Sequence, residues 1–441
     1  MIAGPLIAGK AMDEKLARAL AEREAEAVAL TRALVAFPTV NPPGEAYTPC
    51  AEFLGRRLAA SGFAVQYIRG EGAPGDSDRY PRTNVVGRLE TGRPGPTVHF
   101  NGHLDVVEVG RGWTVDPFAG LVRDGRIYGR GTCDMKGGLA AAVVAVEALL
   151  AAGIPLAGAI EISGTVDEES GGFGGVAHLA QLGFFSKPRV DHVIIPEPLN
   201  VDRVCIGHRG VWWAEVETFG RIAHGSMPFL GDCAIRHMAA FIQALEAEVF
   251  PELDQRRTAM PVVPDAARAS TLNLNGIRAG TVPDGTGLQA PCVPDHCRLT
   301  LDRRYLVEES LDAVKGEIGA VLERLEATRP GFTYAVRELM HVAPIMTEPT
   351  APVPQAVAAA IRSVLGKEAQ FVASPGTYDQ KHIARIGHLH DCVAYGPGIL
   401  DLAHQPDEFV VIADLVAAMR VMALSTVSLM RLPSLTGLTG N

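Results

Sequence analysis

The chain lacks the features that mark secreted, disulfide-bonded and nucleic-acid-binding proteins. Its 441 residues include seven cysteines, an odd and scattered set that does not form a disulfide framework and is typical of a reducing compartment. No run rich in lysine and arginine occurs, and the net charge is −10. A nucleic-acid partner or an anionic membrane is therefore disfavoured. We expect a cytoplasmic globular protein of two or three domains.

The chain also lacks a convincing membrane span, leader or phosphate loop. Its longest apolar stretch, residues 139–162, is interrupted by Glu147 and then by glycine and proline, which predicts a buried helix, a turn and a strand. Residues 1–10 carry one lysine and a broken apolar run without signal-peptide architecture. The glycine-rich segment 171–179 has neither the GxGxxG spacing nor the lysine of a P-loop.

Hydrophobic periodicity predicts alternating helices and strands in the first half of the chain. Expected helices cover residues 14–37, 50–61 and 136–152, and expected strands cover 97–102, 159–166 and 192–195. This alternation resumes after about residue 341 and ends in a helix over 412–430. We therefore predict an α/β domain with a mainly parallel, doubly wound sheet.

The middle of the chain has a different rhythm. Between residues 211 and 337 the expected elements follow the order β-α-β-β-α-β, which is typical of a ferredoxin-like domain. We accordingly expect a discontinuous domain formed by residues 1–206 and 340–441, interrupted by an inserted domain over residues 207–339.

Acidic residues and histidines gather where the expected strands end. These are His103 and Asp105, Asp134, the Asp167-Glu168-Glu169 run, Glu197 and His404. Ligands of open parallel sheets bind beyond the carboxyl ends of the strands, so one site built from both parts of the discontinuous domain is expected. Each group taken alone has an ordinary structural explanation as a surface pair, a solvated turn or a helix cap.

Taken together, these residue types suit a site for two metal ions. Two histidines and three carboxylates can give each of two zinc ions one imidazole and one terminal carboxylate, while the fifth group bridges them. Asp105 could accept the second N–H of the His103 imidazole and fix its orientation. One of the adjacent Glu168 and Glu169 could face the metals while the other acts as a general base.

Several strings resemble the M20 metallopeptidase family, in particular its acetylornithine deacetylase and succinyl-diaminopimelate desuccinylase branch. They are GHLDVVEVG, DGRIYGRGTCDMKGG, TVDEESGG, PEP and AHQPDE, in this order along the chain. The resemblance implies a zinc-binding α/β domain with an inserted lid and dimerisation domain, and so a homodimer. It implies two Zn²⁺ ions, with Co²⁺ or Mn²⁺ as substitutes.

The resemblance also assigns roles to single residues. The implied metal ligands are His103, Asp134, Glu169, Glu197 and His404. Asp134 would bridge the two ions, and the Asp134–Met135 peptide bond would be cis. Glu168 would be the general base, and Asp105 would orient His103.

Further implied roles concern the substrate. His224 in GRIAHGSMPFLG would reach the partner subunit's active site and stabilise an oxyanion, and Arg304 in LDRR would bind a substrate carboxylate. Gly376, Thr377 and Asp379 match a substrate-binding loop loosely. Pro291 stands where relatives usually carry an asparagine, so the substrate contact of that asparagine is not expected here.

The predicted activity is hydrolysis of the amide bond of an N-acyl amino acid or a close analogue, of the deacetylase or desuccinylase type. A dipeptidase or carboxypeptidase, or a deformylase, could use the same metal site. A non-catalytic binding protein with this fold is the remaining alternative, and the intact set of ligands with Glu168 argues against it.

Overall fold

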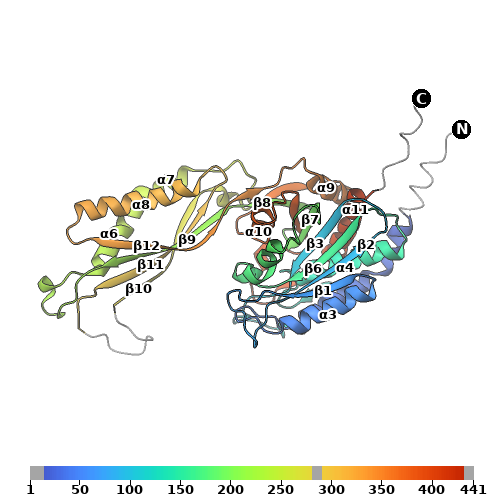
Figure 1. Cartoon of the computed structure of the whole chain (residues 1–441), viewed down its shortest axis with the longest axis horizontal. Coiled ribbons are helices and arrows are strands. Elements are labelled where there is room, and N and C mark those ends of the chain that lie inside the picture. Colours follow the sequence, from blue (N-terminus) through green and yellow to red (C-terminus); the bar gives the residue numbers. More distant parts are fainter. Residues whose placement is uncertain (1–13, 281–290, 432–441) are drawn as a thin grey trace, which may run out of the picture. The chain divides into compact units, whose positions relative to one another are not determined.

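The computed structural model describes residues 14–280 and 291–431, and these fall into two compact units (Figure 1). Unit 1 combines the chain up to residue 206 with residues 347–372 and the chain from residue 378 onward. Unit 2 consists of residues 207–346 together with the short segment 373–377. The expectation about residues 1–10 lies outside the described residues.

Most of a mixed sheet of nine strands lies in unit 1, and its edge residues 345–346 belong to unit 2. Eight of them follow the spatial order β1-β2-β6-β3-β7-β15-β8-β13, and β14 pairs with β8. Their bounds are β1 Ala64–Arg69, β2 Thr83–Glu90, β3 Thr97–His103, β6 Ala159–Thr165, β7 His192–Pro198, β8 Arg203–His208, β13 Ile345–Met346, β14 Gln370–Ser374 and β15 Cys392–Gly396.

The central strands of this sheet pair in parallel. β3 runs parallel to both β6 and β7, and β15 runs parallel to β7. The flanking pairs β1–β2, β2–β6, β15–β8 and β8–β13 are antiparallel. The centre of the sheet thus has the predicted parallel pairing, whereas these flanking pairs are antiparallel.

Apolar helices pack against this sheet and form the main core. They are α2 Glu24–Val35, α3 Tyr47–Ala60, α4 Lys136–Ala151, α9 Pro352–Leu365 and α11 Ile412–Leu429. A helix over residues 14–22 precedes α2 and is separated from it by a turn at Arg23. α4 is buried almost throughout because it packs against β3, α2 and α11, which explains its nearly uniform apolar sequence.

One helix among the described residues, α11, is long and apolar enough to cross a membrane by length and composition. Its mean hydropathy over 18 residues is 1.6, and 56% of that window is buried within the protein. α11 packs against α4 and α9, as the core helix of a globular domain does.

Smaller elements complete unit 1. A three-stranded sheet contains β4 Leu121–Arg123, β5 Arg126–Tyr128 and β16 Phe409–Val411 in the order β16-β5-β4. The short helices are η1 Glu168–Ser170, η2 Phe173–Ala177, α5 His178–Gln181, α10 Gln380–Arg385 and η6 Leu400–Leu402.

Unit 2 has the predicted β-α-β-β-α-β order. Its main elements are β9 Gly210–Phe219, α6 Ala234–Ala244, β10 Thr271–Ala279, β11 His296–Tyr305, α8 Leu311–Thr328 and β12 Thr333–Val342. η3 Pro228–Leu230, η4 Leu245–Val249, α7 Phe250–Gln255 and η5 Asp265–Arg268 lie in the connections. The antiparallel strand order β10-β11-β9-β12 is that of a ferredoxin-like sheet, and α6 and α8 pack against it in a second core.

Candidate metal centre

His103 is the last residue of β3, and its side chain is almost fully buried, with 1% exposed. Its Nδ1 lies 2.9 Å from the backbone oxygen of Asp105. Its Nε2 lies 3.0 Å from Oδ1 of Asp134 and 3.7 Å from Oε1 of Glu197, which belongs to the neighbouring parallel strand β7. Two carboxylates from separate elements therefore meet one imidazole nitrogen.

Asp134 lies in the loop between β5 and α4, and its two carboxylate oxygens face different imidazoles. Oδ1 faces His103, whereas Oδ2 lies 3.4 Å from Nε2 of His404. The Asp134–Met135 peptide bond is cis, as predicted from the sequence. Asp134 thus stands between the two histidines, which is the arrangement required of a shared ligand.

His404 brings the C-terminal part of the chain to the same place. Its Nε2 lies 3.1 Å from Oε2 of Glu169, which belongs to the η1 turn after β6. The other oxygen of Glu169, Oε1, is buried and has no hydrogen-bond partner in the part of the chain that the structure describes. A buried carboxylate oxygen without a donor is costly unless a cation or another donor satisfies it.

The spacing of these atoms suits divalent metal ions. Ligand atoms at about 2.0–2.2 Å from a tetrahedral ion lie roughly 3.3–3.6 Å from one another. The four imidazole–carboxylate distances given above run from 3.0 to 3.7 Å, close to that interval. Ligand atoms of His103, Asp134 and Glu169 all lie within 4.8 Å of one another. The donor set therefore fits two ions, with His103 and Glu197 on one side of Asp134 and His404 and Glu169 on the other.

The electrostatics of the cluster also favour cations. Burial opposes charge on His103, but the carboxylates of Asp134 and Glu197 outweigh it and hold the pKa of His103 well above its usual value. Hydrogen bonds to Asp134 and Glu169 raise the pKa of His404 to about 10. Burial, followed by the Asp134 charge, raises the pKa of Glu197. Carboxylates outnumber imidazoles in the cluster, and divalent ions would balance this negative charge.

Asp105 lies within ion-pair distance of His103, but its carboxylate has closer contacts elsewhere. Its carboxylate lies 3.6 Å from Nδ1 of His103, which is nearer to the Asp105 backbone oxygen. The carboxylate instead accepts the backbone N–H groups of Glu168 and Glu169, at 3.2 and 3.0 Å, and the side-chain amide of Asn41 at 3.1 Å. The difference arises because β3 and η1 approach closely enough for Asp105 to satisfy two donors of the turn.

Glu168 points to a lysine that the sequence analysis did not single out. Its Oε1 accepts a hydrogen bond from Nζ of Lys381 at 2.8 Å. Asp379, just before α10, is buried and accepts a hydrogen bond from Asn101 of β3 at 2.9 Å. Burial and the nearby charge of Glu168 raise the pKa of Asp379 to about 7.

Glu408 braces the loops that carry Asp134 and His404. Its Oε1 accepts the backbone N–H groups of Gly131, Cys133 and Asp134, at 3.0, 2.9 and 3.1 Å. Its Oε2 is paired with Arg130 at 2.6 Å. The guanidinium of Arg130 also donates to the backbone oxygen of His404. Glu408 closes the AHQPDE motif, so its position next to His404 was the one available sequence signal.

The remaining sequence-predicted residues belong to unit 2, apart from Asp379. His224 is exposed, and its Nδ1 accepts a hydrogen bond from the backbone N–H of Ser226 at 3.1 Å. The Ser226 hydroxyl lies 2.7 Å from the same nitrogen. The carbonyl oxygen of Pro291 accepts the backbone N–H of Gly225, next to His224. Pro291 therefore has a backbone contact beside His224 although it lacks the amide of an asparagine.

Arg304 and the loop glycine are also placed in unit 2. Arg304 forms a two-pronged ion pair with Asp302, at 2.7 and 3.1 Å, while its neighbour Arg303 is buried on the other face of β11. Gly376 donates its backbone N–H to the Ser374 hydroxyl at 3.2 Å, and Thr377 follows it. These residues lie in a different compact unit from the five clustered side chains.

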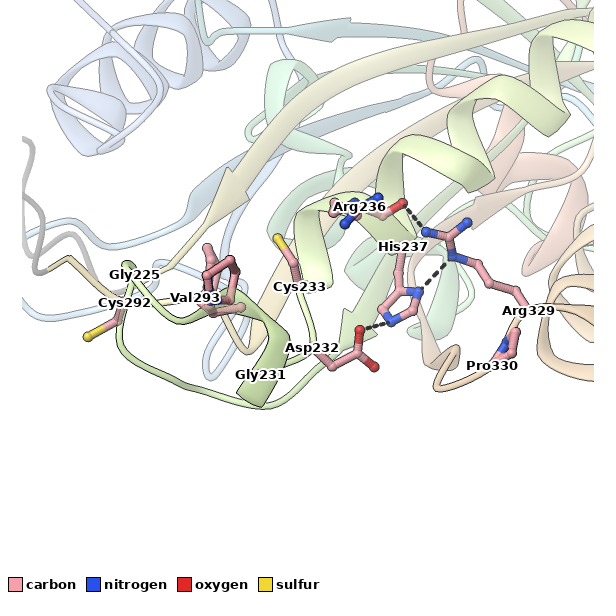
Figure 2. A pocket seen from close by; sticks show the side chains of 12 residues that line it. Gly225, Gly231, Asp232, Cys233, Arg236, His237, Cys292, Val293, Arg329 and Pro330 are labelled. Carbon is pink, nitrogen blue, oxygen red and sulfur yellow. Dashed lines mark hydrogen bonds and ion pairs between the residues drawn. The ribbon is translucent and has the colours of Figure 1, made fainter.

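A cavity of about 540 Å³ lies in unit 2 at the start of α6 (Figure 2). Asp232, His237 and Arg329 on its wall are bonded in series, with His237 accepting from Arg329 at 2.9 Å and contacting Asp232 at 2.9 Å. Arg329 also donates to the backbone oxygen of Arg236. Asp232, His237 and Arg329 form hydrogen bonds and ion pairs with one another. The cavity wall thus differs from the cluster around Asp134, where several carboxylates face two imidazoles.

Comparison with known proteins assigns the family. Residues 99–426 match the model of peptidase family M20/M25/M40. The succinyl-diaminopimelate desuccinylase of Burkholderia multivorans is 30% identical over 378 residues, covering 84% of this chain and 90% of the relative. The enzyme of the same name from Burkholderia pseudomallei is 29% identical, covering 87% and 93%.

Solved structures show the same fold at lower identity. The dipeptidase Dug1p from Saccharomyces cerevisiae has a TM-score of 0.75 at 17% identity, covering 95% of this chain and 99% of that one. Human carnosine dipeptidase 1 has a TM-score of 0.74 at 20% identity, covering 96% and 99%. A Bacillus subtilis protein described as a dinuclear metal-binding peptidase of family M20 has a TM-score of 0.64 at 16% identity, covering 92% and 98%. The chain therefore belongs to the M20/M25/M40 peptidase family, whose members are metal-dependent hydrolases.

Proposed function

We propose that this protein hydrolyses the amide bond of an N-acyl amino acid or a close analogue, in the manner of a deacetylase or desuccinylase. The observation that carries the proposal is Asp134, whose two oxygens face His103 and His404 while Glu197 and Glu169 complete the two sides. The desuccinylase relatives, which match this chain over most of their length, support the choice of substrate class.

We propose that the five side chains hold two divalent ions, with Zn²⁺ as the physiological metal and Co²⁺ or Mn²⁺ as substitutes. The mixture of imidazole and carboxylate donors suits zinc. Such ions, when bound, supply Lewis acidity that polarises the scissile carbonyl and acidifies a water molecule. The remaining chemistry is assigned to residues of the chain itself.

Glu168 is the proposed general base. It would accept a proton from the attacking water and return that proton to the nitrogen of the leaving amine. Its backbone N–H is fixed by Asp105, and its Oε1 is held by Lys381. Asp105 thus becomes a proposed positioning residue for the turn that carries Glu168, rather than mainly for His103.

His224 is the proposed stabiliser of the oxyanion. Because Nδ1 accepts the backbone N–H of Ser226, a neutral imidazole must carry its proton on Nε2. An Nε2–H donor is what a developing oxyanion requires. We further propose that His224 acts in the partner's active site of a homodimer formed through the inserted domain, residues 207–339, beside a catalytic domain of residues 1–206 and 340–441.

Arg304, Gly376 and Thr377 are the proposed substrate contacts. Arg304 would bind a substrate carboxylate in place of, or together with, its pairing to Asp302. Asp379 is buried and bonded to Asn101, so we assign it a supporting position beside Lys381. The protein is proposed to act in the cytoplasm on small molecules.

A panel of substrates tests the activity. Acetyl-, succinyl- and formyl-amino acids should be compared with dipeptides on enzyme loaded with Zn²⁺. We expect hydrolysis of acylated amino acids that is lost on chelation and restored by Zn²⁺ or Co²⁺. Preference for dipeptides would instead assign a dipeptidase or carboxypeptidase, preference for formyl-amides a deformylase, and failure to hydrolyse any of them would overturn the proposal.

A Glu168→Gln variant tests the assigned base. This change keeps the side-chain shape but removes the group that accepts the proton. We expect the rate to fall by about 10²–10⁴-fold while metal content stays at the wild-type value. Full activity of the metal-loaded variant would contradict the assignment.

A further inference from the structure

Lys381 places a buried ammonium group against Glu168. It is the second residue of α10, and only 4% of its side chain is exposed. Its Nζ lies 2.8 Å from Oε1 of Glu168, whose side chain is 11% exposed. The two residues are 213 positions apart in the chain, and the packing of α10 against η2, which follows the η1 turn, brings them together.

The surroundings of Lys381 keep it charged. A buried ammonium is stable only when charges or acceptors compensate for the lost water. Lys136 illustrates the opposite case, because burial lowers its pKa to about 8 while Nζ donates to the backbone oxygen of Phe37. For Lys381 the carboxylates of Glu168 and Asp379 outweigh burial and raise the pKa.

Other contacts hold the backbone of the same turn but leave the Glu168 side chain to be oriented. Asp105 accepts the backbone N–H groups of Glu168 and Glu169. His382, next to Lys381, lies 2.6 Å through Nε2 from the backbone oxygen of Gly171. These contacts fix the backbone of the turn at Glu168, whereas the ion pair with Lys381 fixes the position of the Glu168 carboxylate.

We propose that Lys381 is a positioning residue for the reaction, which holds one oxygen of the Glu168 carboxylate so that the other faces the attacking water. This inference rests on the proposed function, because it gives Lys381 a purpose only if Glu168 moves a proton. With Oε1 engaged by Lys381, the transferred proton is carried on Oε2. A carboxylate displaced by about 1 Å from its productive position can cost on the order of 10²-fold in rate.

Three lysine variants test the proposal. Lys381→Met removes the charge but keeps the length of the side chain, Lys381→Arg keeps the charge, and Lys367→Met alters an exposed lysine as a matched control. We expect Lys381→Met to lower kcat by about 10–100-fold with KM changed by less than about threefold. Lys381→Arg should recover most of that loss, and Lys367→Met should behave as wild type.

Metal content and thermal unfolding separate positioning from loss of structure. Both Lys381 variants should keep the wild-type metal stoichiometry, because the hydrogen bond and ion pair of Lys381 are made to Glu168 and not to any of the five clustered side chains. Loss of kcat that follows loss of metal would overturn the proposal. So would a Lys381→Met enzyme with wild-type kcat, or an Lys381→Arg enzyme as slow as Lys381→Met at equal metal content.

A double variant shows whether Lys381 acts through Glu168. If it does, Glu168→Gln combined with Lys381→Met should be no slower than Glu168→Gln alone. Independent, multiplying losses would overturn the inference while leaving the proposed function in place. A wild-type enzyme inert towards the whole panel, or a fully active Glu168→Gln enzyme, would instead overturn the proposed function and this inference with it.

Discussion

The two histidines of the candidate metal centre stand in contrasting surroundings. His103 ends a fully buried central strand, and 1% of its side chain is exposed. His404 lies in the segment between η6 and β16, has a positive φ of 64°, and has a half-exposed side chain. The side of the centre with His103 and Glu197 is set by strands, whereas the side with His404 depends on a loop.

This contrast suggests that the two halves of the site hold their ligands with different firmness. The strand-borne half is formed by the pairing of β3 with β7. The loop-borne half is held in place by the Arg130–Glu408 pair, which reaches the backbone on both sides of the site. We therefore expect the ion on the His404 side to exchange more readily than the ion on the His103 side.

Removing Asp134, the ligand shared by the two halves, should abolish the difference in metal affinity between them. In an Asp134→Ala variant both halves lose their common oxygen donor, so both ions and at least about 10³-fold of the rate should be lost. Metal analysis and steady-state kinetics measure both effects, with Asp254→Ala at an exposed position as the control. Retention of two ions would contradict the bridging role.

Removing each histidine should expose the difference between the halves. His404→Ala should keep one tightly bound ion and lose about 10²–10³-fold of the rate, because the strand-borne half stays intact. His103→Ala should keep at most an ion that dialysis removes. Equal residual metal affinity in the two variants would refute the contrast.

Glu161 forms a buried ionic cluster with β3, the strand that ends in His103. It lies on β6, buried, and contacts His99 of β3 at 3.0 Å and the guanidinium groups of Arg88 and Arg189 at 2.9 and 2.8 Å. Burial would raise its pKa, but these partners dominate and lower the pKa from 4.5 to about 2. The ionised carboxylate is therefore favoured in the folded protein.

Glu161→Gln should lower the free energy of unfolding at pH 7 by about 3 kcal/mol, which corresponds to a pKa shift of roughly two and a half units. The folded pKa is depressed, so this stabilisation is present above about pH 4.5 and is lost as the pH falls towards 2. Urea unfolding of wild type and variant at several pH values measures the difference. A gap that stays constant down to pH 2 would contradict the ionic explanation.

Glu408→Gln should weaken the loop-borne half more than the strand-borne half. The amide cannot accept three backbone N–H groups and an arginine as the carboxylate does, so the Asp134 and His404 loops lose their common support. We expect the weaker ion to lose about 10–100-fold in affinity, as for other groups that orient metal ligands. Calorimetric zinc titration, with Glu348→Gln as the control, measures it, and an unchanged weaker site would argue against the brace.

Residues at strand ends could be predicted from the sequence because the geometry of parallel strands is general. His103, Glu169 and Glu197 come from β3, the turn after β6, and β7, which are adjacent, so their side chains meet at one edge. The ferredoxin-like order of unit 2 is likewise visible in the spacing of apolar residues along α8 and β9.

Contacts between distant segments could not be predicted in this way. Lys381 carries no periodic or local signal, and its partner Glu168 is more than two hundred residues away. Glu408 is marked only by its place in the AHQPDE motif, and its partners are likewise more than two hundred residues away. The carboxylate of Asp105 was assigned to His103, its neighbour in sequence, although the approach of η1 offers it two backbone donors. β1 was missed because its residues are largely exposed and lack an alternating apolar pattern.

Anomalous diffraction from crystals of the zinc-loaded protein, recorded on both sides of the zinc absorption edge, tests the central claim most directly. The account predicts two peaks flanking the carboxylate of Asp134, one touching His103 and Glu197 and the other touching His404 and Glu169. Peaks remote from Asp134, or these five side chains splayed around an empty space at saturating zinc, would contradict it.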